Sequence, residues 1–118
     1  MKRDLRLFIE DILKSIKNIK EFSKGLSEKE FLKSKMEQSA IERELEIIGE
    51  SVKNIPESVK NKYPEVRWRG IAGFRDVLSH AYFGVISERI WDIIKKDLPI
   101  LEKQILKIKK EVIKNETS

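Results

Sequence analysis

One short segment of the chain holds the residues best suited to acid–base and phosphate chemistry. It contains the single histidine of the sequence, His80, and Arg75 five residues before it. A guanidinium offers a rigid fork of donors that matches phosphate oxygens, and an imidazole exchanges a proton near neutral pH. The pair could therefore cleave RNA. His80 would take the proton from a ribose 2'-hydroxyl, and Arg75 would stabilise the charge that develops on the phosphate.

The polar residues of this segment follow one face of a predicted helix. Steps of four, three and four residues align Arg69, Gly73, Asp76 and His80. At about 100° per residue, His80 lies roughly 130° from the centre of the apolar stripe, so we expect it to be exposed. A neighbouring row contains Arg75, Ser79 and Tyr82. Arg75 and His80 are roughly 140° apart on an ideal helix, yet both side chains are long enough to converge on one anion.

A single histidine imposes a condition on this mechanism. Cleavage needs one group that accepts a proton and a second proton carrier for the leaving group. A twofold dimer that brought two copies of this face together would supply two His80 and two Arg75 side chains to one cleft. Gly73 on the same face would permit close approach of the two helices. The residues therefore predict that the active unit is a homodimer.

The composition restricts the chemistry that other parts of the chain can contribute. The chain has 118 residues, and 40% of them are apolar. Residues 1–118 are therefore expected to form a single domain around one modest core. The absence of Cys excludes thiolate metal sites and Cys nucleophiles, and one His excludes a zinc site built on several histidines. We expect no metal and no cofactor. The net charge of +5 favours an anionic partner without requiring one.

Charges interrupt every apolar group of the amino-terminal segment. This pattern provides neither the apolar stretch of a signal peptide nor a membrane span. We therefore expect a soluble, cytoplasmic protein that does not act in a membrane.

The elements that must position these residues are helices. A first helix is expected over about residues 3–24, with Gly25 after it and with an apolar stripe formed by Leu5, Phe8, Ile9, Ile12, Ile16, Ile19 and Phe22. Ser27 and Glu30 form a capping box that begins a second helix, which we expect to be long and to end at Pro56. A seam suited to packing along another helix runs through its second half: Ile41, Leu45, Ile48, Val52 and Ile55.

The second half of the chain continues this pattern. A helical turn is expected at residues 57–62, and the helix with His80 should bury the stripe Trp68, Ile71, Phe74, Leu78 and Ala81. Gly84 is expected to break the chain before Ser87 caps a long last helix, and Pro99 should bend that helix or reset its backbone bonding. Together these elements predict an all-α, up-and-down bundle of about four or five helices.

Several of these residues also have a simpler interpretation. Arg, Asp and His on the outer face of a helix are most often only solvated, and the lysine-rich tail is usually a solvated face. Trp68, between Arg67 and Arg69, could stack on a base, but its place in the apolar stripe favours the core. Trp91 is expected to be a packing residue.

The segment Trp-Arg-Gly-Ile-Ala-Gly-Phe-Arg-Asp-Val-Leu-Ser-His-Ala-Tyr-Phe-Gly, residues 68–84, resembles the Arg-x4-His-x-Tyr signature of HepT-like toxins, within the HEPN superfamily of helical domains. Residues 42–51 (Glu-Arg-Glu-Leu-Glu-Ile-Ile-Gly-Glu-Ser) and 90–99 (Ile-Trp-Asp-Ile-Ile-Lys-Lys-Asp-Leu-Pro) are also similar to segments of that family. The resemblance covers nearly the whole chain, and the ordered combination of the three segments makes it specific.

The resemblance implies a dimeric helical bundle in which Arg75 and His80 of both subunits line the cleft of a metal-independent ribonuclease. It also implies a partner, an MntA-type nucleotidyltransferase antitoxin that adds AMP to the motif tyrosine, here Tyr82. Bulky, charged AMP at that position would compete with RNA phosphate. The commonest family form has Asn after the motif Arg, where this chain has Asp76. That carboxylate could orient His80 or repel RNA.

Two other functions remain compatible with the sequence. The chain could be a noncatalytic nucleotide-binding or regulatory partner of a minimal nucleotidyltransferase, which the Asp76 departure favours. It could also be a helical interaction module that uses the Ile41 to Ile55 seam.

Overall fold

The first helix follows from isoleucines at helical spacing. The computed structural model describes residues 2–80 and 83–117, and its first element is α1 (Lys2–Ser23). Four isoleucines of α1 are buried: Ile9, Ile12, Ile16 and Ile19. Gly25 follows with φ 78°, a left-handed conformation that glycine adopts without strain. The expected helix is confirmed, except that Phe22 at its end is exposed and contributes little to the core.

The expected long second helix is two helices. The capping box is present, since Ser27 Oγ accepts from the Glu30 amide at 3.1 Å and Glu30 Oε1 accepts from the Ser27 amide at 3.0 Å. These hydrogen bonds lower the pKa of the Glu30 carboxyl. However, α2 (Glu28–Lys33) stops at Ser34, which has extended backbone dihedrals, and α3 (Lys35–Asn54) begins after it.

Gln38 explains why the chain can turn at Ser34. Its buried amide donates to the carbonyl of Phe31 at 2.8 Å, and the Ser34 amide donates to the same oxygen at 3.1 Å, so two hydrogen bonds hold the end of α2 at this point. The turn brings Phe31 into the core, where its ring centroid lies 5.4 Å from that of Trp91. A continuous helix could not bury Phe31 in this way.

The seam of the third helix is entirely buried within the chain. Its five apolar residues, Ile41 to Ile55, are at most 7% exposed, and α3 packs on α1 and on α5 (Trp68–His80). The hypothesis of an interaction module that uses this seam is therefore wrong, because the seam already forms the core of its own bundle. The expected turn at residues 57–62 is confirmed as α4 (Glu57–Lys62), with Pro56 before it.

The last third of the chain departs from the prediction at one point. α6 (Phe83–Asp92) contains both Gly84 and Ser87, so Gly84 is not the break and Ser87 is not a cap. Ser87 lies inside α6 and is buried, and its hydroxyl donates to Gln38 Oε1 at 3.1 Å. A serine in a helix interior is tolerated where its hydroxyl finds such a partner.

Pro99 has the expected effect on the backbone. A π-helical turn, η1 (Ile93–Asp97), comes directly before α7 (Leu98–Thr117), and the Leu98 amide donates to the carbonyl of Ile93. Proline has no N–H and crowds the carbonyl four residues before it, so a wider turn at this place relieves the conflict.

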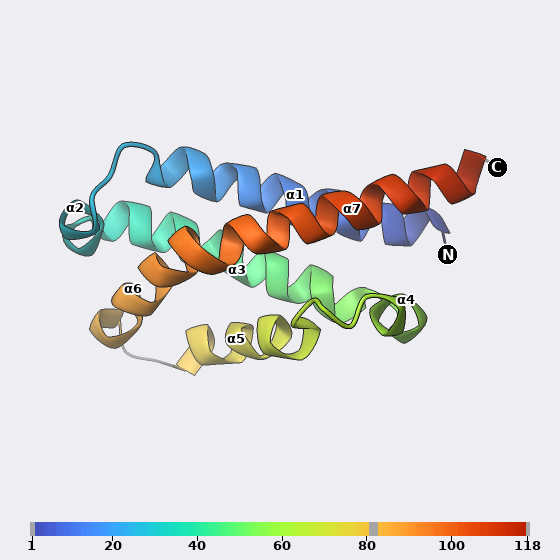
Figure 1. Ribbon diagram of the computed structural model, residues 1–118. Coiled ribbons are helices and arrows are strands. Elements are labelled where there is room, and N and C mark those ends of the chain that lie inside the picture. Colours follow the sequence, from blue (N-terminus) through green and yellow to red (C-terminus); the bar gives the residue numbers. More distant parts are fainter. Residues whose placement is uncertain (1, 81–82, 118) are drawn as a thin grey trace.

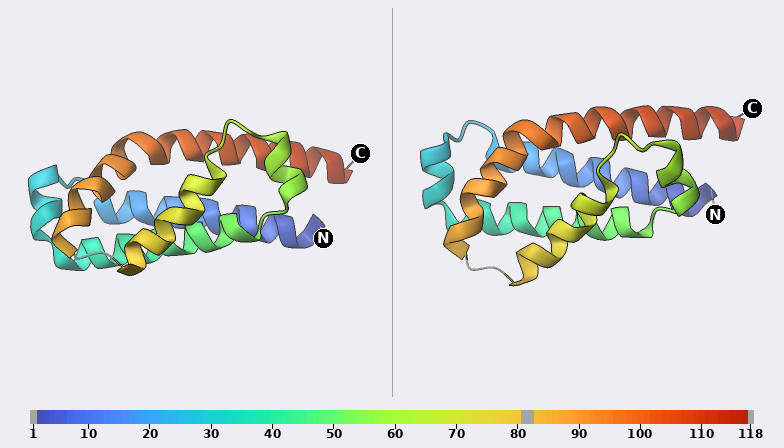
Figure 2. Two further views of the ribbon diagram at one scale, coloured as in Figure 1. Left: turned by 90° about the horizontal axis from the view of Figure 1, so that it is seen from below. Right: turned by 60° about the horizontal axis from the view of Figure 1, so that its bottom comes forward.

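The four long elements form the bundle that the sequence predicts. α1, α3, α5 and the α6–η1–α7 run alternate in direction, and α2 and α6 lie at the end of the bundle opposite the chain termini (Figure 1). α5 crosses α3 obliquely on one side of the bundle (Figure 2). The described residues contain no strand, and their seven α-helices exceed the predicted number because α2 and α4 are short additional helices. No described helix is long and apolar enough to span a membrane.

Candidate active site on helix α5

The helix with the candidate catalytic residues is anchored at its first residue. Trp68 is buried, and its indole N–H donates to the carbonyl of Tyr63 at 3.0 Å. Ile71, Phe74 and Leu78 are partly buried against the core. Trp68 is therefore a core residue, as its position in the stripe predicts. Ala81, the last residue of that predicted stripe, lies outside the described residues.

The outer face of α5 is exposed, as its spacing predicts. This face carries Arg69, Gly73, Asp76 and His80. An added Cβ at Gly73 would meet no atom within 4 Å in this chain, so the surface around it is open.

Arg75 lies where α5 comes closest to α3. Its Cβ would be 2.9 Å from a Cβ added at Gly49, a separation that real Cβ atoms do not show. Only glycine at position 49 therefore allows the two helices to approach this closely. The guanidinium then reaches Glu50, the next residue of α3, with 3.1 Å between Arg75 Nη1 and Glu50 Oε2. The Arg75 side chain stays 37% exposed.

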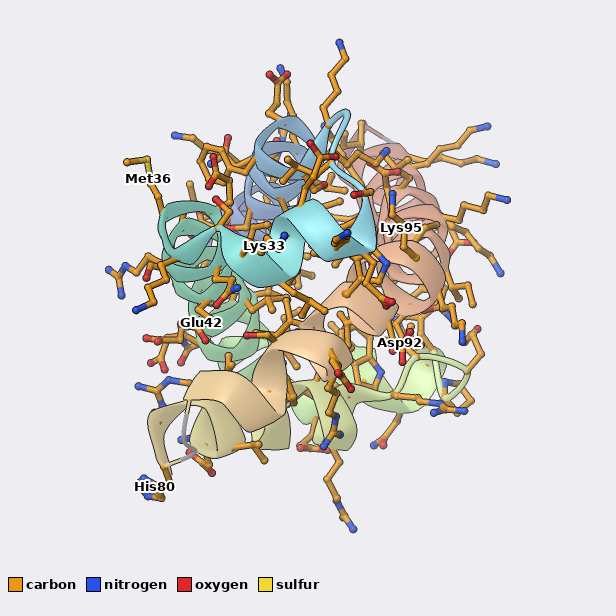
Figure 3. The ribbon with its side chains drawn as sticks, turned by 90° about the vertical axis from the view of Figure 1, so that its left-hand side faces the viewer. Lys33, Met36, Glu42, His80, Asp92 and Lys95 are labelled. Atoms are coloured by element: carbon orange, nitrogen blue, oxygen red, sulfur yellow. The ribbon has the colours of Figure 1, made fainter. Side chains whose placement is uncertain are left out.

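His80 is the last residue of α5, and its side chain is directed away from the bundle (Figure 3). With the described residues it forms no hydrogen bond or ion pair. The same is true of Asp76, so this carboxylate does not hold His80 here. The Ser79 hydroxyl donates to the backbone carbonyl of Arg75 at 3.1 Å. Tyr82 lies outside the described residues.

In a single chain the Arg75 guanidinium and the His80 imidazole do not point towards a common position. Arg75 is turned towards α3 by its ion pair, whereas His80 is directed outwards from the end of α5. Five residues of helix separate them by about 7.5 Å along the axis. The described residues of a single chain therefore offer two accessible functional groups without a closed pocket around both.

A shallow hollow of about 280 Å³ opens beside Arg75, between α1, α3 and α5. It is lined by Phe8, Asp11, Arg43, Glu46, Ile47, Glu50, Ser51, Asn54 and Arg75. Glu42, Glu46 and Glu50 follow one another at intervals of four residues and so form an acidic row along α3. Partial burial, and then the nearby Glu46 charge, raise the pKa of the Glu42 carboxyl. The surroundings of Arg75 are thus acidic, and its positive charge is locally compensated.

A larger hollow of about 500 Å³ lies on the other side of α5, between that helix, α6 and α7. Its floor is apolar, and Arg89 on its rim lies over the Phe74 ring at 5.0 Å from the centroid. α5 is therefore covered on the α3 side and open on the α7 side.

The sequence did not single out Gly49 or Glu50 as site residues. Both belong to the segment that resembles family members, but their approach to Arg75 depends on how α3 and α5 cross. The one available signal was a glycine, a poor helix former, inside an otherwise strongly helical run. Within the described part of the chain, no group of three His, Cys, Asp or Glu side chains is arranged to hold a metal ion.

Comparison with known families agrees with the motif on α5. Residues 12–108 match the model of the family described as Ribonuclease HepT-like. This range includes α5 and the segments of α3 and α6–η1 that contact it or lie beside it.

Several named proteins are similar to the chain over most of its length. "Putative RNase MJ0127" of Methanocaldococcus jannaschii is 48% identical over 111 residues, which cover 94% of this chain and 92% of that protein. "Probable ribonuclease HepT" of Thermococcus cleftensis is 44% identical over 110 residues, 93% of this chain and 100% of that protein. "Gamma-glutamylcyclotransferase and putative RNase MJ0434" of M. jannaschii is 41% identical over 118 residues, all of this chain but 53% of that protein. No solved structure is significantly similar to the chain.

Proposed function

The chain belongs to the HepT-like ribonuclease family, and on that premise we propose that it is a metal-independent RNA endonuclease, the toxin of a toxin–antitoxin system. The observation that carries the proposal is the pair of functional groups on α5. Arg75 and His80 are both accessible, on a helix whose outer face packs on nothing else in the described chain. The names of its relatives, which describe ribonucleases, support the reaction class.

In the proposed mechanism the two residues have different tasks. His80 takes the proton from a ribose 2'-hydroxyl, whose oxygen then attacks the adjacent phosphorus. Arg75 stabilises the negative charge that builds up on the phosphate oxygens. The bond to the 5'-oxygen breaks, and that oxygen receives a proton. Asp76 and Ser79 support the site, Asp76 as a charge close to His80 and Ser79 through its bond to the Arg75 carbonyl.

The leaving oxygen needs a second proton carrier, and we place it in a second copy of the chain. The outer face of α5 is exposed and open at Gly73, so two copies could meet there around a twofold axis. Each chain would then contribute one His80 and one Arg75 to a shared cleft. This arrangement also supplies what one chain lacks, namely groups that converge on one phosphate.

An RNA-cleavage assay in EDTA tests the reaction and its metal independence together. His80→Ala should lower the cleavage rate by a factor of about 10² to 10⁴, the usual contribution of a general acid–base group. Arg75→Ala should cause a loss of similar order. Lys17→Ala, which removes one positive charge from an exposed position of α1, outside the proposed cleft, is the matched control and should cleave like the wild type. Equal cleavage by wild type and His80→Ala would overturn the proposal. Saturable nucleotide binding without cleavage would favour the regulatory alternative.

The proposal includes control by an MntA-type nucleotidyltransferase that transfers AMP to Tyr82. Its support is the Arg-x4-His-x-Tyr arrangement, which places Tyr82 two residues after His80. An AMP group there would put negative charge and bulk where RNA phosphate must bind. When the chain is produced together with the partner and purified, its mass in mass spectrometry should be larger by one AMP group. The mass of the Tyr82→Phe variant produced in the same way should be unchanged. A Tyr82→Phe toxin that the partner still silences fully would count against this mechanism.

A further inference from the structure

The direction of the Arg75 side chain is set by α3 rather than by α5. Its Cβ packs closely against α3 at Gly49, and its guanidinium forms an ion pair with the carboxylate of Glu50. These two residues are consecutive in the sequence, so one turn of α3 contacts both the base and the tip of the side chain. An arginine on an exposed face without such contacts would sample many rotamers.

The ion pair contributes orientation more than stability. The Glu50 side chain is 52% exposed and that of Arg75 is 37% exposed. Ion pairs at such exposure contribute little to the stability of a fold, because solvent screens the two charges. Glu50 can therefore be replaced without unfolding the chain, and the consequence for Arg75 can be observed by itself.

We infer that Glu50 is a positioning residue for Arg75 in RNA cleavage, with Gly49 providing the close approach that makes the contact possible. This inference rests on the proposed function. A guanidinium has five N–H groups, and the 3.1 Å contact uses the Nη1 end of the fork. The remaining N–H groups stay available to phosphate oxygens, in a direction that Glu50 fixes. Misplacement of such a group by about 1 Å is enough to cost a large factor in rate.

The neighbouring pair on α3 provides a comparison within the same helix. Glu46 is one turn before Glu50 and lies 3.9 Å from Arg43, at the outer limit of an ion pair. Both partners belong to α3 and neither belongs to α5. Removal of Glu46 changes the acidity of the same surface by one charge but leaves Arg75 and its partner in place. Glu46→Ala is therefore a matched control for electrostatic effects.

The experiment measures kcat and KM for RNA cleavage by Glu50→Ala, Glu50→Gln, Glu50→Asp and Glu46→Ala. Glu50→Ala should lower kcat about tenfold, with KM within about twofold of wild type, because Arg75 is misplaced in the transition state rather than lost. Glu50→Gln should lower kcat less, and Glu50→Asp should restore part of the rate. Glu46→Ala should match the wild type, and the thermal unfolding midpoint of each variant should stay close to that of the wild type.

A double-mutant comparison separates this role from a general structural one. In an Arg75→Ala background, Glu50→Ala should cause no further loss of kcat, because its effect acts through Arg75. Faster cleavage or tighter RNA binding by Glu50→Ala would overturn the inference, since Glu50 would then compete with phosphate for the guanidinium. Full activity of Glu50→Ala where Arg75→Ala is inactive would overturn the inference alone. Full activity of Arg75→Ala would overturn it together with the proposed function.

Discussion

The three-helix core and the helix with the candidate active site are held in different ways. α1, α3 and α7 enclose a continuous set of buried isoleucines and leucines, and α2 covers the end of this core that lies away from the chain termini (Figure 1). α5 packs extensively on α3 alone among the described helices, and only Trp68 of its residues is buried. Most of its apolar side chains are half-buried, and its α7 side faces the 500 Å³ hollow.

The difference shows that folding and chemistry depend on different positions in this chain. Neither Arg75 nor His80 is among the residues that close the core, and the residues of the outer α5 face contribute little packing. The two regions meet at the Gly49–Arg75 contact. Variants on either side of this contact should therefore affect stability and activity separately, and variants at the contact should affect both.

The largest effect on stability is expected in the core. Ile16 is fully buried in α1, so Ile16→Ala should lower the free energy of unfolding by about 2 to 5 kcal/mol through lost burial and the cavity left behind. Denaturation in urea measures this value. Leu7→Ala, at a 54% exposed position of the same helix, should cost much less. Equal costs for the two variants would contradict the distinction between a closed core and an exposed face.

An intermediate effect is expected where the two regions meet. In Gly49→Ala the new Cβ would be 2.9 Å from Arg75 Cβ, so α5 must move away from α3. Overpacking typically costs about 1 to 3 kcal/mol, and the better helix propensity of alanine offsets about 1 kcal/mol. We expect a net destabilisation of about 1 kcal/mol and faster hydrogen exchange in α5 than in α1. Gly70→Ala, with its nearest contact at 3.9 Å, should be neutral or stabilising. A Gly49→Ala protein as stable as Gly70→Ala would show that the contact is not tight.

The smallest effect is expected at the connection between α4 and α5. Burial, and then a hydrogen bond to Glu111 of α7, raise the pKa of the Tyr63 hydroxyl to about 12. Because this pKa is higher in the folded chain than in the unfolded one, the neutral hydroxyl stabilises the fold below about pH 10, and this stabilisation is lost as the pH rises towards 12. The free energy of unfolding should fall over that range in the wild type and less in Tyr63→Phe. If the free energy of unfolding fell equally with pH in the two proteins, the Tyr63 hydroxyl would not stabilise the fold through its hydrogen bond to Glu111.

Most of the fold could be predicted from the sequence because the apolar spacing is regular. The isoleucines of α1, the seam of α3, the capping box at Ser27 and the turn at residues 57–62 all have local signals, and the structure confirms them. Two boundaries could not be predicted in this way. The turn at Ser34 depends on the Gln38 side chain reaching back to Phe31, and the burial of Ser87 within α6 depends on that same glutamine. Both are contacts between helices, which spacing along one helix does not record.

The site shows the same division between local and tertiary information. The exposure of Asp76 and His80 follows from the helical period of α5, and it was predicted correctly. The contact of Arg75 with Gly49 and Glu50 joins residues that are more than twenty positions apart in the sequence, and it depends on how α3 and α5 cross. The dimer and the role of Tyr82 stay predictions, since they concern a second chain and a residue outside the described part.

The alternating directions of the four long helices have a practical consequence for all of these measurements. Both ends of the chain emerge at the end of the bundle opposite α2 and α6, and the final turn of α5 lies well away from them (Figure 1). An affinity tag, a fluorophore or a surface tether can therefore be attached at either terminus without covering His80. Immobilised or dye-labelled protein would present the outer face of α5 to added RNA or to a second chain, so single-molecule and surface-binding assays can follow assembly and cleavage on the same preparation.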